Sequence, residues 1–529
     1  ARRRDSVEEF LSGSYGGLAA SPMLPAELGA SLGGGASGGG SLSFGSLPVG
    51  SPHFGHLEEV PRRHLMQPGH RGQALRRKVL RGAKVIFVTA GYSGKRFIFE
   101  RAKELGVVSI VVDSPDSWAT SLEEEGVVSK FVPVDMAMDA DRILGEVFGA
   151  VQVLEDEIGS VDGVVSFCEL AVPLVSRLAD MLGLPGNPYR AVMEARDKHR
   201  TRAVMQAAGL PTPGFAKVEG LEALRPAMGK VGFPAVIKPV NGVASIGVLK
   251  VEDEDGLGKA FRTVKEQLDA AVIKSGALEL QSAAAEAGDG SGGQGGDSKA
   301  SWMDCSLMLE EYLDGEEVDC DVVMADSECV YCAVTDNWPT FEPHFLETGS
   351  NCPSDLPKEK QRELMKLCVA AVKALGLTTG VFHVEAKYTS KGPRIIEINC
   401  RMGGGPVWQT NKLVWGVDLI EEHLMCSVGI PSRPPKTNFP LRYIAEYSIN
   451  APISGEITSV DFMEPYMEDV DVIYANVLVE KGQRVMGACD GLPTWIAELM
   501  VQKPTLQGAI SYAKAIEDKF LRDAPIQTS

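Results

Sequence analysis

From residue 84 onward, short apolar runs typical of strands alternate with stretches in which apolar residues recur at helical spacing. Residues 84–91 and 107–113 are short apolar runs typical of buried strands, and a helical stretch ending at Leu105 separates them. A further strand, a helix over about 139–157 and another strand continue the alternation. Strands that alternate with helices form parallel sheets covered on both faces. We therefore expect a Rossmann-like α/β domain, although the loop at 91–94 falls short of the dinucleotide-binding pattern G-x-G-x-x-G.

Later in the chain, helices combine with strand pairs. Residues 358–375 place apolar side chains at helical spacing, and residues 413–430 predict a second amphipathic helix. Two strands flank Asp314-Gly315, and short strands and turns lead to a C-terminal helix over about 505–521. The fold class predicted is a multidomain one, with an α/β domain followed by α+β regions and a small α+β lobe at the end.

One predicted β-hairpin gathers polar side chains on a single face. Its strands read FHVEAKY and PRIIEINCR, and Lys391-Gly392-Pro393 between them is a turn signal. Side chains alternate between the two faces of a strand. The expected polar face consists of His383, Glu385, Lys387, Glu397, Asn399 and Arg401. The expected apolar face consists of Phe382, Val384, Ala386, Ile396, Ile398 and Cys400.

The polar face of this hairpin offers ligands for a metal ion. The oxygens of Glu385, Glu397 and Asn399 are hard ligands of the kind that Mg²⁺ prefers, and phosphate oxygens and waters can complete its octahedron. Such a metal neutralises charge in phosphoryl transfer. Arg401 can fork a carboxylate or phosphate, and the glycines that follow let backbone approach a ligand closely. For the E-x-N pattern alone, a solvated surface hairpin is the alternative.

A lysine upstream of the hairpin stands in a position suited to an anion. Lys238 interrupts an apolar strand, and the small-residue loop at 241–247 can offer backbone N–H groups to phosphates. A lysine that snorkels from an edge strand is the alternative. The helical stretch at 194–208 precedes this strand and ends before the break at 211–213.

Composition excludes several classes of protein. The 529 residues carry a net charge of −19, which argues against a general nucleic-acid or anionic-membrane binder. Ten cysteines lack a disulfide framework, and we expect free thiols in a reducing compartment. The one C-x-x-C, at Cys329 and Cys332, is best explained as chance. No apolar run approaches the ~20 residues that cross a bilayer, so we expect a cytoplasmic protein without a membrane or nucleic-acid partner.

Two segments lack apolar periodicity. Residues 1–78 are rich in glycine and serine and predict a disordered tail or linker. The start ARRRDS has no methionine, which is consistent with a piece of a longer multidomain chain. An organelle transit peptide is only weakly indicated, because Glu8 and Glu9 and the glycine tract weigh against it. Residues 283–300 are a Gly-rich insertion to which no chemistry is assigned.

The motifs of the hairpin resemble the metal-binding signature of the ATP-grasp ligases. HVEAK followed by EINCRMGGG carries the resemblance, and N-x-R-M-G-G is similar to the form in the dipeptide-forming members, carnosine synthase and the bacterial L-amino acid ligases. The resemblance covers roughly residues 84–520. It implies an ATP-grasp fold with an N-terminal domain over 79–190, a small subdomain over 191–315, a large subdomain over 316–432 and a C-terminal lobe over 433–529.

The resemblance also implies roles for single residues. Ser350 stands where histidine is common in the related ligases, which leaves the substrates open, and Asp418 of a family G-V-D-L motif is explained equally well as a helix N-cap. Residues that would hold Mg²⁺ or Mn²⁺ are Glu385, Glu397 and Asn399. Residues that would bind ATP are Lys198, Lys238, Ser245, Glu310, Glu311, Leu313 and Glu317. Arg401 would be catalytic, and residues that would face the amino-acid substrates are Glu169, Glu347 and Gly404.

The activity implied is ADP-forming ligation of two amino acids through an acyl phosphate, with ATP and amino acids as the small-molecule partners. An ATP-grasp ligase that joins a different carboxylate to an amine is one alternative. A non-catalytic ATP-binding regulatory module is another, although retention of both lysines and all four polar hairpin residues weighs against it. A homodimer is compatible with the resemblance, and the order of the two substrates stays open.

Overall fold

A computed structural model of the chain describes residues 57, 59–242, 246–274, 277–280, 306–487 and 493–528. Three predictions fall wholly or mainly on other residues: the phosphate contact of Ser245, the Gly-rich insertion at 283–300, and most of the tail. These predictions lie outside the described residues.

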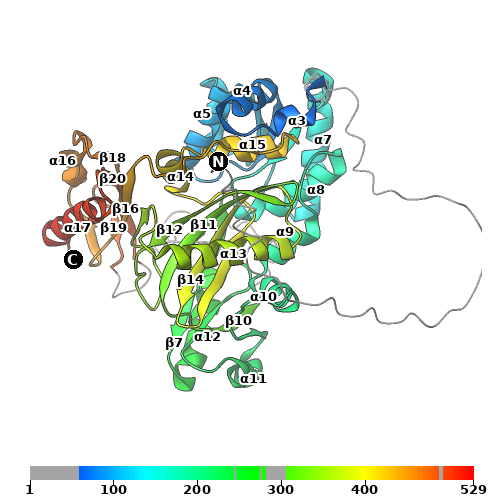
Figure 1. Ribbon diagram of the computed structural model, residues 1–529. Coiled ribbons are helices and arrows are strands. Elements are labelled where there is room, and N and C mark those ends of the chain that lie inside the picture. The colour runs from blue at the N-terminus through cyan, green and yellow to red at the C-terminus, as the bar shows by residue number, and fades with distance from the viewer. Residues whose placement is uncertain are drawn as a thin grey trace, which may run out of the picture.

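The N-terminal domain is a parallel sheet with helices on both faces, as the alternation predicted (Figure 1). The strand order is β3-β2-β1-β4, and the pairings are parallel. Neighbouring residues of β1 belong to different apolar clusters. Phe87 packs with α5, whereas Ile86 packs with α7 and α8. The strands are β1 (Lys84–Val88), β2 (Val108–Asp113), β3 (Lys130–Pro133) and β4 (Gly163–Val165), and the helices are α5 (Arg96–Leu105), α7 (Ala140–Ile158) and α8 (Val172–Leu182).

Two helices precede this domain, α3 (Arg62–Leu65) and α4 (Gly69–Leu80), so the prediction of a disordered tail up to residue 78 is wrong for this stretch. These two helices contain few apolar side chains, and a buried arginine also takes part in their packing. The fully buried guanidinium of Arg76 donates to the backbone carbonyls of Leu65, at 2.8 Å, and Gln67, at 2.9 Å. Composition did not reveal these helices because buried arginine depends on partners distant in the sequence.

A small antiparallel sheet follows, with strand order β5-β10-β6-β7. It packs with two helices around one apolar cluster. The chain leaves β10 at Glu311 and enters the next sheet at Glu316, and Gly315 in between has φ +84°. A Cβ there would lie 2.1 Å from the carbonyl oxygen of Tyr388, so only glycine fits this hinge. The elements are β5 (Phe215–Val218), β6 (Ala235–Pro239), β7 (Leu249–Val251), β10 (Leu307–Glu311), α11 (Leu221–Val231) and α12 (Glu254–Ala270).

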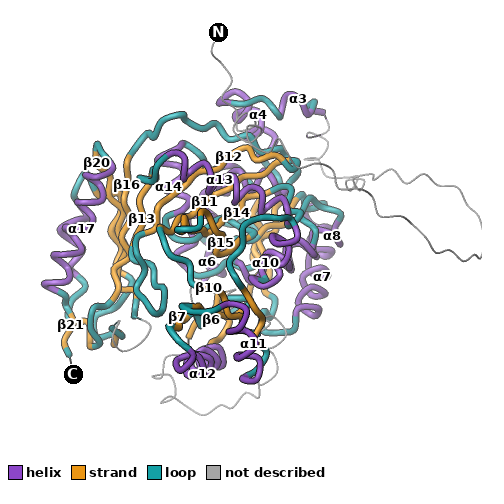
Figure 2. The backbone as a smooth tube through the Cα atoms, turned by 60° about the horizontal axis from the view of Figure 1, so that its bottom comes forward, coloured by secondary structure: helices purple, strands orange, loops and turns teal. Residues whose placement is uncertain are grey.

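The largest sheet has eight strands in the order β15-β14-β11-β12-β13-β16-β20-β18. In the predicted C-terminal α+β lobe, β17 (Gly455–Ile457), β19 (Arg484–Val485) and β21 (Ile526–Gln527) form a small sheet of their own, while β16, β20 and β18 extend the strands of the large subdomain. Figure 2 shows α17 along these C-terminal strands. The elements are β11 (Glu316–Ala325), β12 (Glu328–Asn337), β13 (Gly349–Cys352), β14 (Gly380–Thr389), β15 (Gly392–Asn399), β16 (Tyr443–Asn450), β18 (Val472–Val477), β20 (Trp495–Lys503), α13 (Lys358–Ala374) and α17 (Leu506–Asp523).

Two stretches predicted as single helices are each two helices. Residues 194–208 include the end of α9 (Tyr189–Arg196) and α10 (Lys198–Ala207), and the Asp197 side chain between them caps α10 by accepting from the Arg200 N–H at 2.8 Å. Residues 413–430 include the end of α14 (Val407–Trp415) and α15 (Leu419–Ser427). Asp418 caps α15, as the alternative for this residue predicted.

Two further expectations concern the described residues. No helix among them is long and apolar enough to cross a bilayer. Their eight cysteines are all free thiols, in agreement with the expected absence of a disulfide framework.

Candidate functional site

The hairpin of β14 and β15 is present and brings the polar residues together as predicted. Glu385 pairs with Glu397, and His383 pairs with Asn399 across the two strands. A β-bulge shifts the register after Glu385, however, and Ile396 is the extra residue. The prediction for Ile396 is therefore wrong: it lies on the wall of a cavity, whereas Ile395 takes the place in the apolar core.

A cavity of about 160 Å³, here called the hinge cavity, lies between the small sheet and the large sheet. Its walls come from α10, β6, the hinge at 311–317 and the hairpin. Every described residue predicted to bind nucleotide or metal lines it. These residues are Lys198, Lys238, Glu310, Glu311, Leu313, Glu317, Glu385, Glu397 and Asn399, and Arg401 and Glu347 line it as well.

The cations of the hinge cavity are paired with carboxylates. The Lys198 ammonium lies 2.9 Å from a carboxylate oxygen of Glu397, and Lys387 lies 3.3 Å from Glu317. Lys238 forms an ion pair with Glu310. An anionic ligand could therefore replace the carboxylate partner of each lysine.

Glu310 is held by a second cation, which sequence reasoning missed. Arg202, fully buried on α10, donates from Nε to a Glu310 oxygen at 2.6 Å and from Nη2 to the carbonyl of Ile396 at 2.7 Å. Burial alone would raise the pKa of Glu310, but Arg202 and Lys238 outweigh it and hold that pKa below its usual value. A carboxylate shared by two cations leaves Lys238 only partly neutralised.

The predicted metal ligands at the base of the hairpin are two carboxylates and one amide. Among the described residues, no group of three or more His, Cys, Asp and Glu side chains is arranged for a metal, and the Asn399 Nδ2 donates to Glu385 at 3.4 Å. Burial and the charge of Glu397 raise the pKa of Glu385 to about 8. Burial would do the same to Glu397, but Lys198 keeps its pKa low. His383 offsets the charge of Glu385 only in part, because burial and Glu397 outweigh it, and a metal ion would supply further positive charge.

A second cavity, of about 350 Å³ and here called the interdomain cavity, lies between the N-terminal domain, the hairpin and the C-terminal strands. All three residues predicted to face substrate line it: Glu169, Glu347 and Gly404. Glu169 lies 3.3 Å from Arg401 and 3.6 Å from Arg196. Burial nevertheless raises the pKa of the Glu169 carboxyl above its usual value.

The interdomain cavity also includes residues that sequence reasoning did not assign. Tyr92 and Lys95 enter from the loop after β1, where the sequence showed only an incomplete dinucleotide pattern. His383 shares the polar face with Glu385, and that alternation was its only signal. Asp319 on β11 and Glu446 on β16 gave no signal, because they reach the cavity only through the pairing of strands distant in the sequence.

The two cavities meet. Glu347, Glu385 and Arg401 line both of them. The Arg401 guanidinium lies between the predicted metal and substrate sides: its Nη2 donates to Asn399 Oδ1 at 3.3 Å, while its Nε faces Glu169. A group bound in one cavity is thus adjacent to a group bound in the other.

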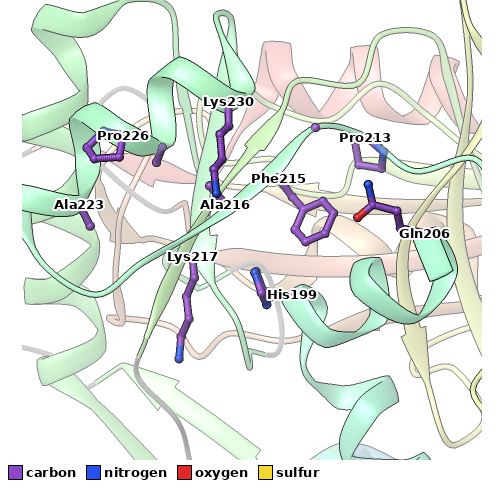
Figure 3. Close-up of a pocket in the computed structure, with 11 residues that line it drawn as sticks. His199, Gln206, Pro213, Phe215, Ala216, Lys217, Ala223, Pro226 and Lys230 are labelled. Carbon is purple, nitrogen blue, oxygen red and sulfur yellow. The ribbon is translucent and has the colours of Figure 1, made fainter. Parts of the chain in front are cut away.

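A third cavity, of about 610 Å³, lies on the small subdomain between α10, β5 and α11 (Figure 3). His199, Phe215, Lys217 and Lys230 line it. It contains none of the predicted site residues, and Lys217 is within ion-pair distance, 3.5 Å, of Glu219. We do not include it in the candidate site.

Comparison with protein families identifies two domains in the chain. Residues 99–186 match the ATP-grasp N-terminal domain, and residues 296–409 match the ATP-grasp domain. The L-amino acid ligase from Bacillus licheniformis superposes with a TM-score of 0.66 over 83% of this chain and 98% of that protein, at 22% identity. The chain therefore has the ATP-grasp fold.

Two kinds of curated protein are similar in sequence. Carnosine synthase 1 of Gallus gallus is 31% identical over 390 residues, which are 71% of this chain and 38% of that protein. Alanine–anticapsin ligase of Bacillus subtilis (strain 168) is 28% identical over 58% of this chain and 59% of that protein. The chain thus spans less than half of carnosine synthase 1 and less than two thirds of the bacterial ligase.

Proposed function

We propose that this chain, which has the ATP-grasp fold, is an ATP-dependent ligase that joins two amino acids by an amide bond through an acyl phosphate. The observation that carries the proposal is the junction of the hinge and interdomain cavities at Arg401, Glu347 and Glu385. A phosphate bound by the lysines on one side lies next to a carboxylate bound on the other. The names of the similar proteins, carnosine synthase 1 and alanine–anticapsin ligase, support amino acids as the substrates.

The hinge cavity would bind ATP. Lys198 and Lys238 would exchange Glu397 and Glu310 for phosphate oxygens, and Glu310, Glu311 and Leu313 at the hinge would contact the adenine. Glu317, two residues after Gly315, would accept hydrogen bonds from the ribose hydroxyls. Preorganised cations next to a transferring phosphoryl group account for most of the catalysis in this kind of reaction.

Glu385, Glu397 and Asn399 would hold Mg²⁺. A metal ion bound there would add to the positive charge that His383 already supplies to Glu385 and would neutralise phosphate oxygens during transfer. Release of Glu397 from Lys198 frees both groups at once, one for the metal and one for phosphate.

The chemistry would proceed in two steps. A carboxylate oxygen of the first amino acid attacks the γ-phosphorus, the bond to the ADP oxygen breaks, and an acyl phosphate forms. The amine of the second amino acid then attacks the acyl carbon, the C–O bond breaks, and phosphate leaves with the amine having lost its proton. Arg401 would stabilise the negative charge on the acyl phosphate and on the tetrahedral oxygen. A cytoplasmic location and a homodimer stay predictions.

Incubation of the protein with Mg-ATP and pooled amino acids, including β-alanine and histidine, tests the proposal. We expect ADP release that depends on amino acids and new masses that correspond to dipeptides. ADP release stimulated only by other carboxylic acids would favour a ligase with a different acid. Nucleotide binding without turnover against any acid would favour a regulatory module.

A further inference from the structure

The cations on the wall of the interdomain cavity already have partners. Arg401 lies 3.3 Å from Glu169, and the His383 ring lies 2.9 Å from a carboxylate oxygen of Asp321. Lys95 is half-buried and donates to the backbone carbonyl of Phe167 on the neighbouring loop. Arg401 and His383 are therefore balanced by carboxylates, whereas the charge of Lys95, on the Tyr92 side of the cavity, has no carboxylate within ion-pair distance among the described residues.

The C-terminal strands bring carboxylates that lack such partners. Glu446 on β16 is only 4% exposed, and Ser448 Oγ donates to it at 3.1 Å. Glu498, on the paired strand β20, accepts from Asn476 at 3.0 Å, and Glu347 approaches from the loop before β13. In the described part of the chain, no lysine, arginine or histidine nitrogen forms an ion pair with any of these three carboxylates.

The same end of the cavity is aromatic. Trp495, which is 40% exposed, and Tyr92 line it, and Tyr474 is close enough for its pKa to be raised by burial and then by the charges of Glu446 and Glu498. Aromatic faces attract cations, and carboxylates beside them add to that attraction. Lys95 already lies 5.7 Å from the centroid of the Tyr92 ring, so Trp495 and the Glu446 carboxyl are the groups that remain for a bound cation.

We infer that the interdomain cavity selects an amino acid whose side chain carries a positive charge, and that Glu446 is the residue that binds this charge. The substrate class is that of basic amino acids, such as lysine, ornithine and arginine. This inference rests on the proposed ligase function and adds a specificity-determining residue to it. The charge of Glu446 would be neutralised by the substrate in place of a proton or a protein cation.

The ionisation of Glu446 gives the inference a pH signature. Burial, with smaller contributions from Glu347 and Glu498, raises the pKa of this carboxyl to about 8, while Ser448 and Ser350 act in the opposite direction. In the empty cavity Glu446 therefore holds a proton at neutral pH, and a bound cation displaces that proton. The affinity for a basic amino acid should rise with pH up to about 8, at most about tenfold per pH unit, whereas the affinity for a neutral analogue should not.

Matched pairs of ligands test the inference: lysine against norleucine, and arginine against citrulline. Binding to the full chain with a nonhydrolysable ATP analogue and Mg²⁺ is measured by calorimetry, and turnover is measured as ADP release. The variant is Glu446→Gln, and the matched control is Glu456→Gln, an exposed carboxylate in the C-terminal region that lines neither cavity. We expect lysine and arginine to bind at least tenfold more tightly than their neutral analogues. Glu446→Gln should abolish this preference and leave norleucine binding unchanged, and Glu456→Gln should preserve it.

Two results would overturn the inference: equal binding of lysine and norleucine by the unaltered protein, or an unchanged preference in Glu446→Gln. Unchanged norleucine binding by Glu446→Gln shows that the variant is folded. The binding measurement separates the two proposals. Glu446-dependent binding of lysine without ADP release would contradict the ligase function and support the cation site, whereas ADP release with neutral amino acids alone would do the reverse.

Discussion

The hinge cavity and the interdomain cavity share three residues but differ in how their charges are balanced. In the hinge cavity Lys198, Lys238 and Lys387 each have a carboxylate within ion-pair distance. In the interdomain cavity Glu446 is buried with hydroxyl groups as its neighbours. The first cavity can therefore receive an anion by exchange of partners. The second can receive a cation without displacing any group of the protein.

In the proposed ligase, this difference would allow one continuous site to bind both a polyphosphate and an amino acid. Buried ion pairs cost little to rearrange when an incoming anion replaces a leaving one, whereas an unpaired buried carboxyl is costly until a cation arrives. The balance of charge thus separates two ligands that would otherwise compete for one continuous space.

The largest effect expected from this comparison concerns Arg202. Arg202→Met would remove the partner of Glu310 and leave the carbonyl of Ile396 without its donor, and it should lower the free energy of unfolding by about 3–5 kcal/mol. Urea denaturation measures this loss. Arg200→Met on the same helix is the control, because its side chain is 62% exposed, and it should cost less than about 0.5 kcal/mol. Equal losses of unfolding free energy in the two variants would show that the Arg202–Glu310 pair does not contribute to stability.

Loss of a metal ligand comes next. Glu397→Ala should reduce amino-acid-dependent ADP release by about 10²- to 10³-fold, because a preorganised charge next to the transferred phosphoryl group would be lost. The control is Glu316→Ala, an exposed carboxylate at the start of β11 that should retain full activity. ADP release at the unaltered rate in Glu397→Ala would remove the metal assignment.

The two cavities should also differ in how strongly their carboxyl groups make stability depend on pH between pH 5 and 8. The pKa of Glu446 is raised to about 8 from 4.5, so between these values the folded protein keeps a proton that the unfolded chain has released, and stability falls as pH rises. Glu446→Gln should therefore stabilise the ligand-free protein, with a gain that grows by about 1.4 kcal/mol per pH unit in this range.

Glu397→Gln should show no such pH dependence between pH 5 and 8. The pKa of Glu397 is lowered, so its stabilising ion pair with Lys198 is fully present above pH 4.5 and is lost only as pH falls through the lowered value. The loss of stability in this variant should be constant from pH 5 to 8. Thermal unfolding of both variants across this range, with a chelator present, checks the two slopes. Parallel slopes would contradict the difference in charge balance.

The smallest effect expected is on the preference for lysine over norleucine when a substitution introduces a histidine next to Glu446. Ser350 pairs with Glu446 across β13 and β16, and Ser350→His would place an imidazole beside this carboxyl. Competition with the substrate's charge should reduce the preference for lysine over norleucine by about tenfold, the equivalent of one pKa unit. Ser350→Ala, which adds no cation, should leave the preference nearly unchanged, and an equal loss in both variants would point to the hydroxyl instead.

The hinge cavity could be predicted from the sequence because its residues lie in short motifs. Glu385, Glu397 and Asn399 are on adjacent strands of one hairpin, and Lys238 is a charged residue inside an otherwise apolar strand. The parallel N-terminal sheet was predictable for the same reason, because the alternation of strands and helices is visible in neighbouring segments of the sequence. The bulge at Ile396 was not, because alternation along a strand assumes a regular register.

The interdomain cavity could be predicted only in part. Its walls come from the loop after β1, from β11, from the hairpin and from β16, and only tertiary pairing brings these segments together. In the sequence, Glu446 is a residue of a predicted strand and belongs to no recognisable motif. The C-terminal residues were predicted to form a small α+β lobe, but the pairing of β16 with β13, which places Glu446 beside the interdomain cavity, had no signal in the sequence.

The central claim is that a carboxylate in the interdomain cavity receives a phosphoryl group from the hinge cavity. The most direct measurement uses an amino acid labelled with ¹⁸O in its carboxylate and follows the label during ligation by mass spectrometry of the released phosphate. Passage through an acyl phosphate predicts one labelled oxygen in each phosphate formed. Phosphate without the label, in a reaction that still yields dipeptide and ADP, would contradict the account.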